Sequence, residues 1–205
     1  MKLLYESHSP YARKVLVMAH EVGLISRIEV IHHETSPLRR NSAVFALNPL
    51  GKVPVLPIDD ELCLFDSTVI CEYLDGLHDG RKMIPPAGAA RWRALRLQSL
   101  AQGLTDAGVA LRWEIERRPE FLRWAEFGEG QRAKLLAGYD FIEREVVSDG
   151  APDIGQIALA TALSWLAFRR LPSFGEGHPR LARWYEQFSQ RPSMLATPFY
   201  GETKD

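Results

Sequence analysis

The pattern of secondary-structure signals changes near residue 80, and this change constrains the fold of the chain more than any other feature. Before it, short apolar runs typical of strands alternate with segments of helical periodicity, and after it only helical patterns follow. The stretch between them, HDGRKMIPPAGAA, contains prolines and glycines but no periodicity, which indicates a linker. We therefore predict one domain at residues 1–78, a linker at 79–88 and a second domain at 89–205.

The first domain is predicted to be α/β, with helices packed on a small mixed sheet. Pro10 suits the first position of a helix and Gly23 suits a C-terminal stop. The runs KVPVLPI and ELCLF, separated by Asp59 and Asp60, predict a hairpin. The predicted elements follow the order βαβαββα, at about residues 2–5, 10–22, 27–32, 41–47, 52–58, 61–65 and 67–77.

The second domain is predicted to be all-α. Asp153 is followed three residues later by Gln156, just before an apolar run, and this spacing predicts a capping box that starts a buried helix. We expect the tail from Ser193 to be irregular. The predicted helices lie at about residues 89–117, 127–147, 153–170 and 179–191.

Composition excludes several classes of partner. The 205 residues carry a formal net charge of −1 with no block of like charges, so we expect neither nucleic acid nor an anionic membrane as a partner. No run approaches the roughly 18 apolar residues of a membrane span, and the first ten residues turn polar too early for a signal peptide. We therefore expect a cytoplasmic protein.

Metal binding is not expected. Cys63 and Cys71 are too few for a disulfide scaffold and wrongly spaced for a zinc knuckle or a redox pair, so we expect two reduced, buried thiols. The six histidines never fall at the i, i+4 spacing that ligates a metal from one helix face.

Three motifs, taken in order, carry a family resemblance: SPYA at 9–12, NPLGKVPVL at 48–56 and LFDSTVICEYL at 64–74. With the helical domain that follows them, they resemble the cytosolic glutathione S-transferase (GST) family, in a serine-type, bacterial-like form. The resemblance spans essentially the whole chain. It implies a thioredoxin-like first domain, an all-helical second domain and a cytoplasmic homodimer. It also implies a detoxifying transferase with glutathione as co-substrate, a small electrophile as the other substrate and no metal.

The second motif is expected to bind the cysteinyl part of glutathione. A residue before proline is biased toward extended conformation, and in the family the Val53–Pro54 bond is cis. The backbone of Val53, beside Pro54, would then pair with the ligand as an added strand. The alternative is an ordinary trans bond at a sheet edge. Lys52 is expected to neutralise a ligand carboxylate or, alternatively, to be a solvated surface lysine.

The third motif is expected to bind the γ-glutamyl end. Asp66 would take the ammonium group, while Ser67 and the helix N-terminus would receive the carboxylate. The family more usually carries Glu where Asp66 stands, and a shorter side chain weakens or relocates the ammonium contact. The alternative for Ser67 is a plain N-cap, a role that we expect it to fill in either case.

Ser9 is the expected activating group. Read alone, Ser9 is an N-cap, but a hydroxyl has one proton to donate as well as lone pairs to accept. The resemblance implies that this proton points at the glutathione thiolate. Tyr5 is the second candidate and Ser7 a weaker one. Glutaredoxin-like relatives carry Cys where Ser9 stands, and a serine cannot form a mixed disulfide, so disulfide reduction by an enzyme cysteine is disfavoured.

The second substrate leaves the weakest signal. By analogy its pocket lies between the first-strand loop, the first long helix of the second domain and the tail. Aromatic and small residues on long helices are more often core or dimer contacts than ligand contacts. A non-catalytic GST-like binding or regulatory protein is the alternative function. The candidate pocket residues are Tyr11, Thr105, Asp106, Trp113 and Phe199.

Overall fold

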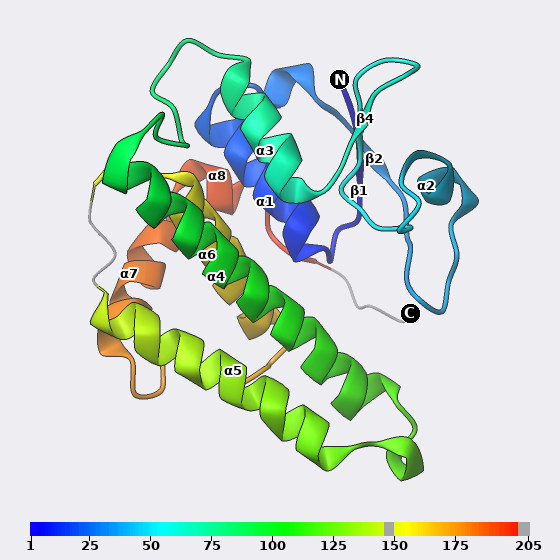
Figure 1. Cartoon of the computed structure of the whole chain (residues 1–205), viewed down its shortest axis with the longest axis vertical. Coiled ribbons are helices and arrows are strands. Elements are labelled where there is room, and N and C mark those ends of the chain that lie inside the picture. The colour runs from blue at the N-terminus through cyan, green and yellow to red at the C-terminus, as the bar shows by residue number, and fades with distance from the viewer. Residues whose placement is uncertain (146–149, 201–205) are drawn as a thin grey trace. The chain divides into compact units, whose positions relative to one another are not determined.

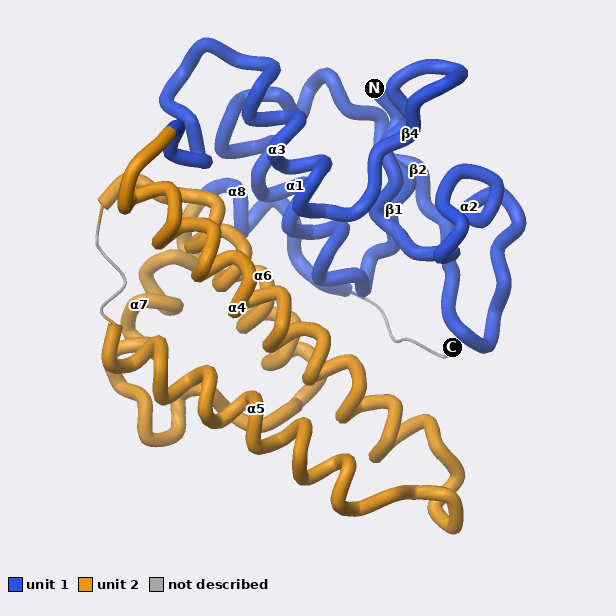
Figure 2. The backbone as a smooth tube through the Cα atoms, viewed as in Figure 1, with its two compact units in different colours: residues 1–86, 192–205 blue, residues 87–191 orange. Residues whose placement is uncertain are grey.

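The chain forms two compact units, which we describe separately (Figure 2). The computed structural model describes residues 1–145 and 150–200. Unit 1 contains residues 1–86 and the tail from residue 192, and unit 2 contains residues 87–191. This division differs from the sequence-based boundaries in that it assigns residues 79–86 and the tail to the first unit.

Unit 1 is built on a mixed set of strands. Strand β1 (Lys2–Tyr5) pairs in parallel with β2 (Glu29–His32), while β3 (Leu56–Pro57) pairs antiparallel with β4 (Cys63–Leu64). A bridge between Leu4 and Val55, also antiparallel, links the two pairs. The predicted order βαβαββα and the predicted hairpin are confirmed.

The helices of unit 1 contact the strands and one another. Helix α2 (Ser42–Leu47) contributes Val44 to an apolar cluster with Leu4, Val53 and Val55. Helix α1 (Pro10–Glu21) packs against α3 (Ser67–Gly76), and both are shown in Figure 1.

The ends of α1 agree with the predicted signals. Pro10 is the first helical residue, and Gly23 follows the helix with a φ of 71°, a conformation that favours glycine. Ser9 therefore lies at a fixed point between β1 and α1.

Unit 2 is entirely helical within its described residues. Helix α4 (Gly88–Arg112) continues into a π-helical turn (Trp113–Arg117) and a 3-10 turn (Glu120–Leu122), followed by α5 (Ala125–Arg144), α6 (Ile154–Phe168) and α7 (Pro179–Ser189). Helix α6 is buried on almost every side and packs closely on α4. A Cβ added at Gly155 would lie 2.6 Å from the carbonyl oxygen of Ala94, so this contact requires glycine.

The sequence-based expectations about the tail and about Cys63 are wrong. The tail from Ser193 is not irregular throughout, because α8 (Pro192–Leu195) forms there and packs on α1. Cys63 is half-buried rather than buried, since it lies in the short hairpin strand β4, whereas Cys71 is buried on α3; both thiols are free. The end of the helix predicted at 127–147 falls on residues 146–147, outside the described residues.

Neither a membrane span nor a metal cluster is found in the part of the chain that the structure describes. None of its helices combines the length and the apolar character needed to cross a bilayer. No group of three or more His, Cys, Asp or Glu side chains gathers there in a way that could hold a metal ion.

The capping box at the start of α6 gives a stability prediction. The Asp153 carboxylate accepts from the Gln156 N–H at 3.0 Å, and the Gln156 side chain accepts from the Asp153 N–H at 3.1 Å. Asp153→Ala should lower the free energy of unfolding by about 1 kcal/mol in urea denaturation. Asp153→Asn, which keeps a capping oxygen, should lose much less. Equal losses in the two variants would contradict a capping role.

Candidate functional site

Ser9 has the geometry of a cap with a proton left to donate. It is the N-cap of α1, and its hydroxyl oxygen accepts from the Ala12 N–H at 3.1 Å. Its backbone is held on both sides, since the Ser9 N–H donates to the backbone carbonyl of Glu6 and the Ser9 carbonyl accepts from the backbone N–H of Arg13, each at 3.0 Å. The side chain is half-buried. One polar group is thus fixed at the positive end of the helix dipole, where an anion is favoured.

Tyr5, the rival activator, ends strand β1 and is buried. Burial is the main reason that the pKa of its hydroxyl is raised to about 12, and the neighbouring Tyr200 and Glu6 raise this pKa further while Arg13 opposes them. The hydroxyl is therefore neutral at physiological pH, so Tyr5 can act only as a neutral hydrogen-bond donor. Ser7, the weaker candidate, is also buried.

The Val53–Pro54 bond is cis, as the resemblance implied. Val53 and Pro54 are buried, while the side chain of Lys52 is exposed. Among the described residues, the backbone N–H and C=O of Val53 have no hydrogen-bond partner. The amide of Asn48 donates to the Lys52 carbonyl at 2.8 Å and so fixes the loop just before Val53. This segment therefore offers the free donor and acceptor that an extended peptide needs.

The start of α3 differs from the prediction in one detail. The N-cap is Asp66, whose carboxylate accepts from the Thr68 N–H at 2.8 Å, and Ser67 is the first helical residue. The expectation that Ser67 caps the helix is wrong, because the adjacent Asp66 fills that role. The hydroxyl of Ser67 is buried and has no partner within the described residues. A buried hydroxyl without a partner is uncommon, and a ligand oxygen would satisfy it.

The N-terminal half of α1 buries two positive charges that the sequence patterns did not single out. Arg13 and Lys14 are both buried, and the Lys14 ammonium lies 3.4 Å from the Thr68 hydroxyl at the start of α3. Buried charges of this kind need partners from distant segments. The sequence signal that could have identified them is the pair of adjacent basic residues in the first turns of a helix expected to be buried.

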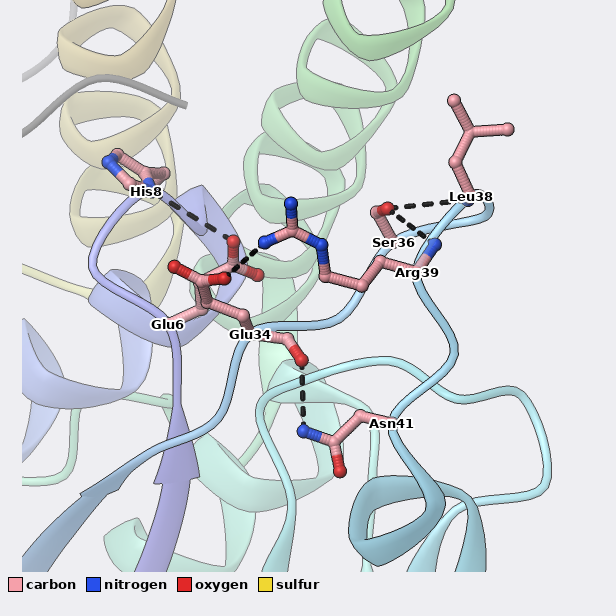
Figure 3. A network of polar contacts seen from close by, with 7 residues as sticks. All are labelled: Glu6, His8, Glu34, Ser36, Leu38, Arg39 and Asn41. Atoms are coloured by element: carbon pink, nitrogen blue, oxygen red, sulfur yellow. Dashed lines mark hydrogen bonds and ion pairs between the residues drawn. The ribbon is translucent and has the colours of Figure 1, made fainter. Parts of the chain in front are cut away.

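The segment with Glu6 and His8 follows β1 and lies beside a second polar loop that follows the neighbouring strand β2 (Figure 3). The guanidinium of Arg39 contacts the Glu34 carboxylate at 2.6 Å, and the Asn41 amide donates to the Glu34 carbonyl at 2.9 Å. On the Ser9 side, the His8 imidazole lies 3.9 Å from the Glu6 carboxylate. The Arg39–Glu34 pair is exposed, so it orders the loop but adds little stability.

The candidate residues for a second substrate belong to different units. Tyr11 and Phe199 are half-buried in unit 1. In unit 2, Thr105 is buried and its hydroxyl donates to the Ala101 carbonyl at 3.0 Å within α4, Asp106 is exposed, and Trp113 begins the π-helical turn. Their assignment to an electrophile pocket stays a proposal.

Comparison with known proteins agrees with this geometry. Residues 8–77 match the family model of the glutathione S-transferase N-terminal domain, and residues 90–187 match that of the C-terminal domain. The uncharacterized GST-like protein YibF of Escherichia coli K12 is 32% identical over 203 residues, which are 96% of this chain and 98% of YibF.

Solved structures agree with the family models. A glutathione transferase family member from Pseudomonas fluorescens Pf-5 with bound glutathione is 40% identical with a TM-score of 0.93, covering 98% of this chain and 99% of its own. A second structure from that organism, with bound S-(propanoic acid)-glutathione, is 39% identical with a TM-score of 0.88, covering 98% and 100%. With both family models matched in order and a relative of this identity aligned along nearly its whole length, the chain belongs to the glutathione S-transferase family.

Proposed function

We propose that this protein is a glutathione transferase that activates the thiol of glutathione for attack on a small electrophile. The observation that carries the proposal is the geometry of the Ser9 hydroxyl. Its oxygen accepts from the Ala12 N–H, while its own proton remains to be donated. A thiolate placed at the N-terminus of α1 would accept that proton and gain from the helix dipole.

Glutathione is proposed to bind along unit 1. Its cysteinyl backbone would pair with the N–H and C=O of Val53 next to Pro54. Its γ-glutamyl carboxylate would accept from the Ser67 hydroxyl and the first N–H groups of α3, while the exposed Asp66 would take the ammonium group. Lys52, exposed at the same loop, would neutralise a carboxylate. The glutathione-bound relative supports this proposal.

The size of the activation is modest. A thiol with a pKa of about 8.5 is roughly 3% ionised at pH 7, and lowering this pKa by about two units, or about 2.7 kcal/mol, ionises roughly three-quarters of it. A less basic thiolate is also a weaker nucleophile. With a Brønsted slope of about 0.4–0.5, this cancels much of the gain in reactivity that ionisation gives. Holding the electrophile beside the sulfur must supply much of the remaining rate.

The proposed electrophile is a small molecule. The relative with bound S-(propanoic acid)-glutathione carries a short acid on the sulfur, which supports a small conjugated group here as well. We also propose a cytoplasmic homodimer with a detoxifying role, as the family resemblance implies. A non-catalytic glutathione-binding protein is the alternative, and binding without turnover of any chloro-nitroarene or peroxide would favour it.

Ser9→Ala should lower kcat/KM about ten- to a hundredfold with a generic electrophile, because the thiolate loses its hydrogen-bond donor. Tyr5→Phe should stay within about threefold of the wild type. Because Ser9 and not Tyr5 is proposed to donate to the thiolate, the pH–rate profile of Tyr5→Phe should keep the apparent pKa of the wild type. A larger loss in Tyr5→Phe than in Ser9→Ala would make Tyr5 the activating residue.

Ser67→Ala should weaken glutathione binding about tenfold, because the variant removes a hydrogen bond to a charged carboxylate. The Ser67 hydroxyl has no protein partner among the described residues, so the variant should unfold at the same urea concentration as the wild type. Ser26→Ala, at an exposed position, serves as the matched control. Isothermal titration calorimetry with glutathione measures the effect, and unchanged affinity in Ser67→Ala would remove Ser67 from the proposed site.

A further inference from the structure

Arg13 ties the first helix to the tail of the chain. The side chain is 4% exposed and stands one helical turn after Ser9. Its Nη2 donates to the Met194 carbonyl at 3.1 Å and its Nε donates to the Thr197 hydroxyl at 3.4 Å. The guanidinium also stacks on the Phe199 ring, 4.5 Å from the ring centroid. One buried cation therefore contacts three positions of the tail.

The tail is held at the other end of α1 as well. The Ser193 hydroxyl donates to the carboxylate of Glu21, the last residue of α1, at 2.5 Å. The Thr197 hydroxyl donates to the Ser193 carbonyl at 2.8 Å and so links the two attachment points. In Figure 1 the tail, in orange to red, runs from α8 toward the N-terminal end of α1. The tail thus follows α1 back toward Ser9.

The same cation lies close to the end of strand β1. Its charge lowers the pKa of Tyr5, on which Tyr200 of the tail also acts. The backbone N–H of Arg13 donates to the Ser9 carbonyl at 3.0 Å. Arg13 therefore lies in the same turn of α1 as Ser9, and its charge acts on Tyr5 together with Tyr200 of the tail.

An arginine suits this position better than other side chains of similar length. Burying a positive charge is costly unless it is hydrogen-bonded, and a guanidinium can donate to two acceptors while stacking on an aromatic face. A lysine keeps the charge but lacks the planar fork. A methionine fills a similar volume but has neither the charge nor the planar fork.

We propose that Arg13 is a positioning residue that holds residues 194–199 against the Ser9 end of α1, so that Phe199 packs against the group carried on the glutathione sulfur. The proposal rests on the proposed function and deepens it. The family resemblance already implied the tail as part of the second-substrate pocket; the new element is Arg13 as the residue that fixes the tail, and the resulting wall favours substrates with an apolar group next to the sulfur. Arg13 itself does not touch the ligand.

The test compares glutathione with S-hexylglutathione, which carries an apolar chain on the sulfur, by calorimetry. In Arg13→Met we expect S-hexylglutathione to bind about tenfold more weakly and glutathione to bind within about twofold of the wild type. Arg13→Lys should recover part of the loss. Phe199→Ala should match Arg13→Met, and the double variant should be no worse than either, because both act through one contact. Arg27→Met, at an exposed arginine, is the matched control.

Hydrogen exchange of the tail provides a readout that needs no ligand. Amides of residues 194–199 should exchange at least about tenfold faster in Arg13→Met than in wild type and Arg27→Met, while amides of α6 should not change. Unchanged exchange of the tail would overturn the proposal, as would additive losses in the double variant or an equal loss of affinity for both ligands in Arg13→Met. If the wild type binds neither ligand, the proposed function fails and the inference falls with it. If the wild type binds both and Arg13→Met does not discriminate between them, only the inference fails.

Discussion

Helix α1 has to be buried along most of its length while its N-cap, Ser9, stays available to a ligand, and the rest of unit 1 is arranged around this constraint. Val15, Val17 and Met18 have no exposed surface, so the middle of the helix is fixed by packing. Pro10 has no N–H to satisfy, and the Ser9 hydroxyl accepts from the Ala12 N–H, so these two positions of the first turn need no partner from another segment. A helix held in this way presents the Ser9 hydroxyl at a position that side-chain motion changes very little.

The polar groups around this helix divide into those that the protein satisfies and those that it leaves for a ligand. Arg13 has its acceptors in the tail, and Asp66 accepts from the α3 backbone. The Ser67 hydroxyl and the Val53 backbone have no protein partner within the described residues. Free groups of this kind are costly when buried, and a peptide with a carboxylate at one end would satisfy them together. The proposed glutathione site rests on this complementarity.

Much of the fold could be predicted because its signals are local. The strand Lys2–Tyr5, the proline at the start of α1, the left-handed Gly23 and the capping box at Asp153 each depend on residues within a few positions of one another. The position of the tail could not be predicted in this way. It depends on contacts between Arg13 and residues more than 180 positions later, and a basic residue in a helix does not reveal its distant partner. The choice of Asp66 over Ser67 as the cap was ambiguous because adjacent residues could both cap.

The most direct test of the account is the ionisation of glutathione when it is bound to the protein, followed by ultraviolet difference spectroscopy of the thiolate as a function of pH. We expect the thiol of bound glutathione to have an apparent pKa well below the value of about 8.5 for a free thiol, and Ser9→Ala to return it most of the way to that value. A bound thiol that titrates like the free one in the wild type would contradict the account, as would an equally lowered pKa in Ser9→Ala.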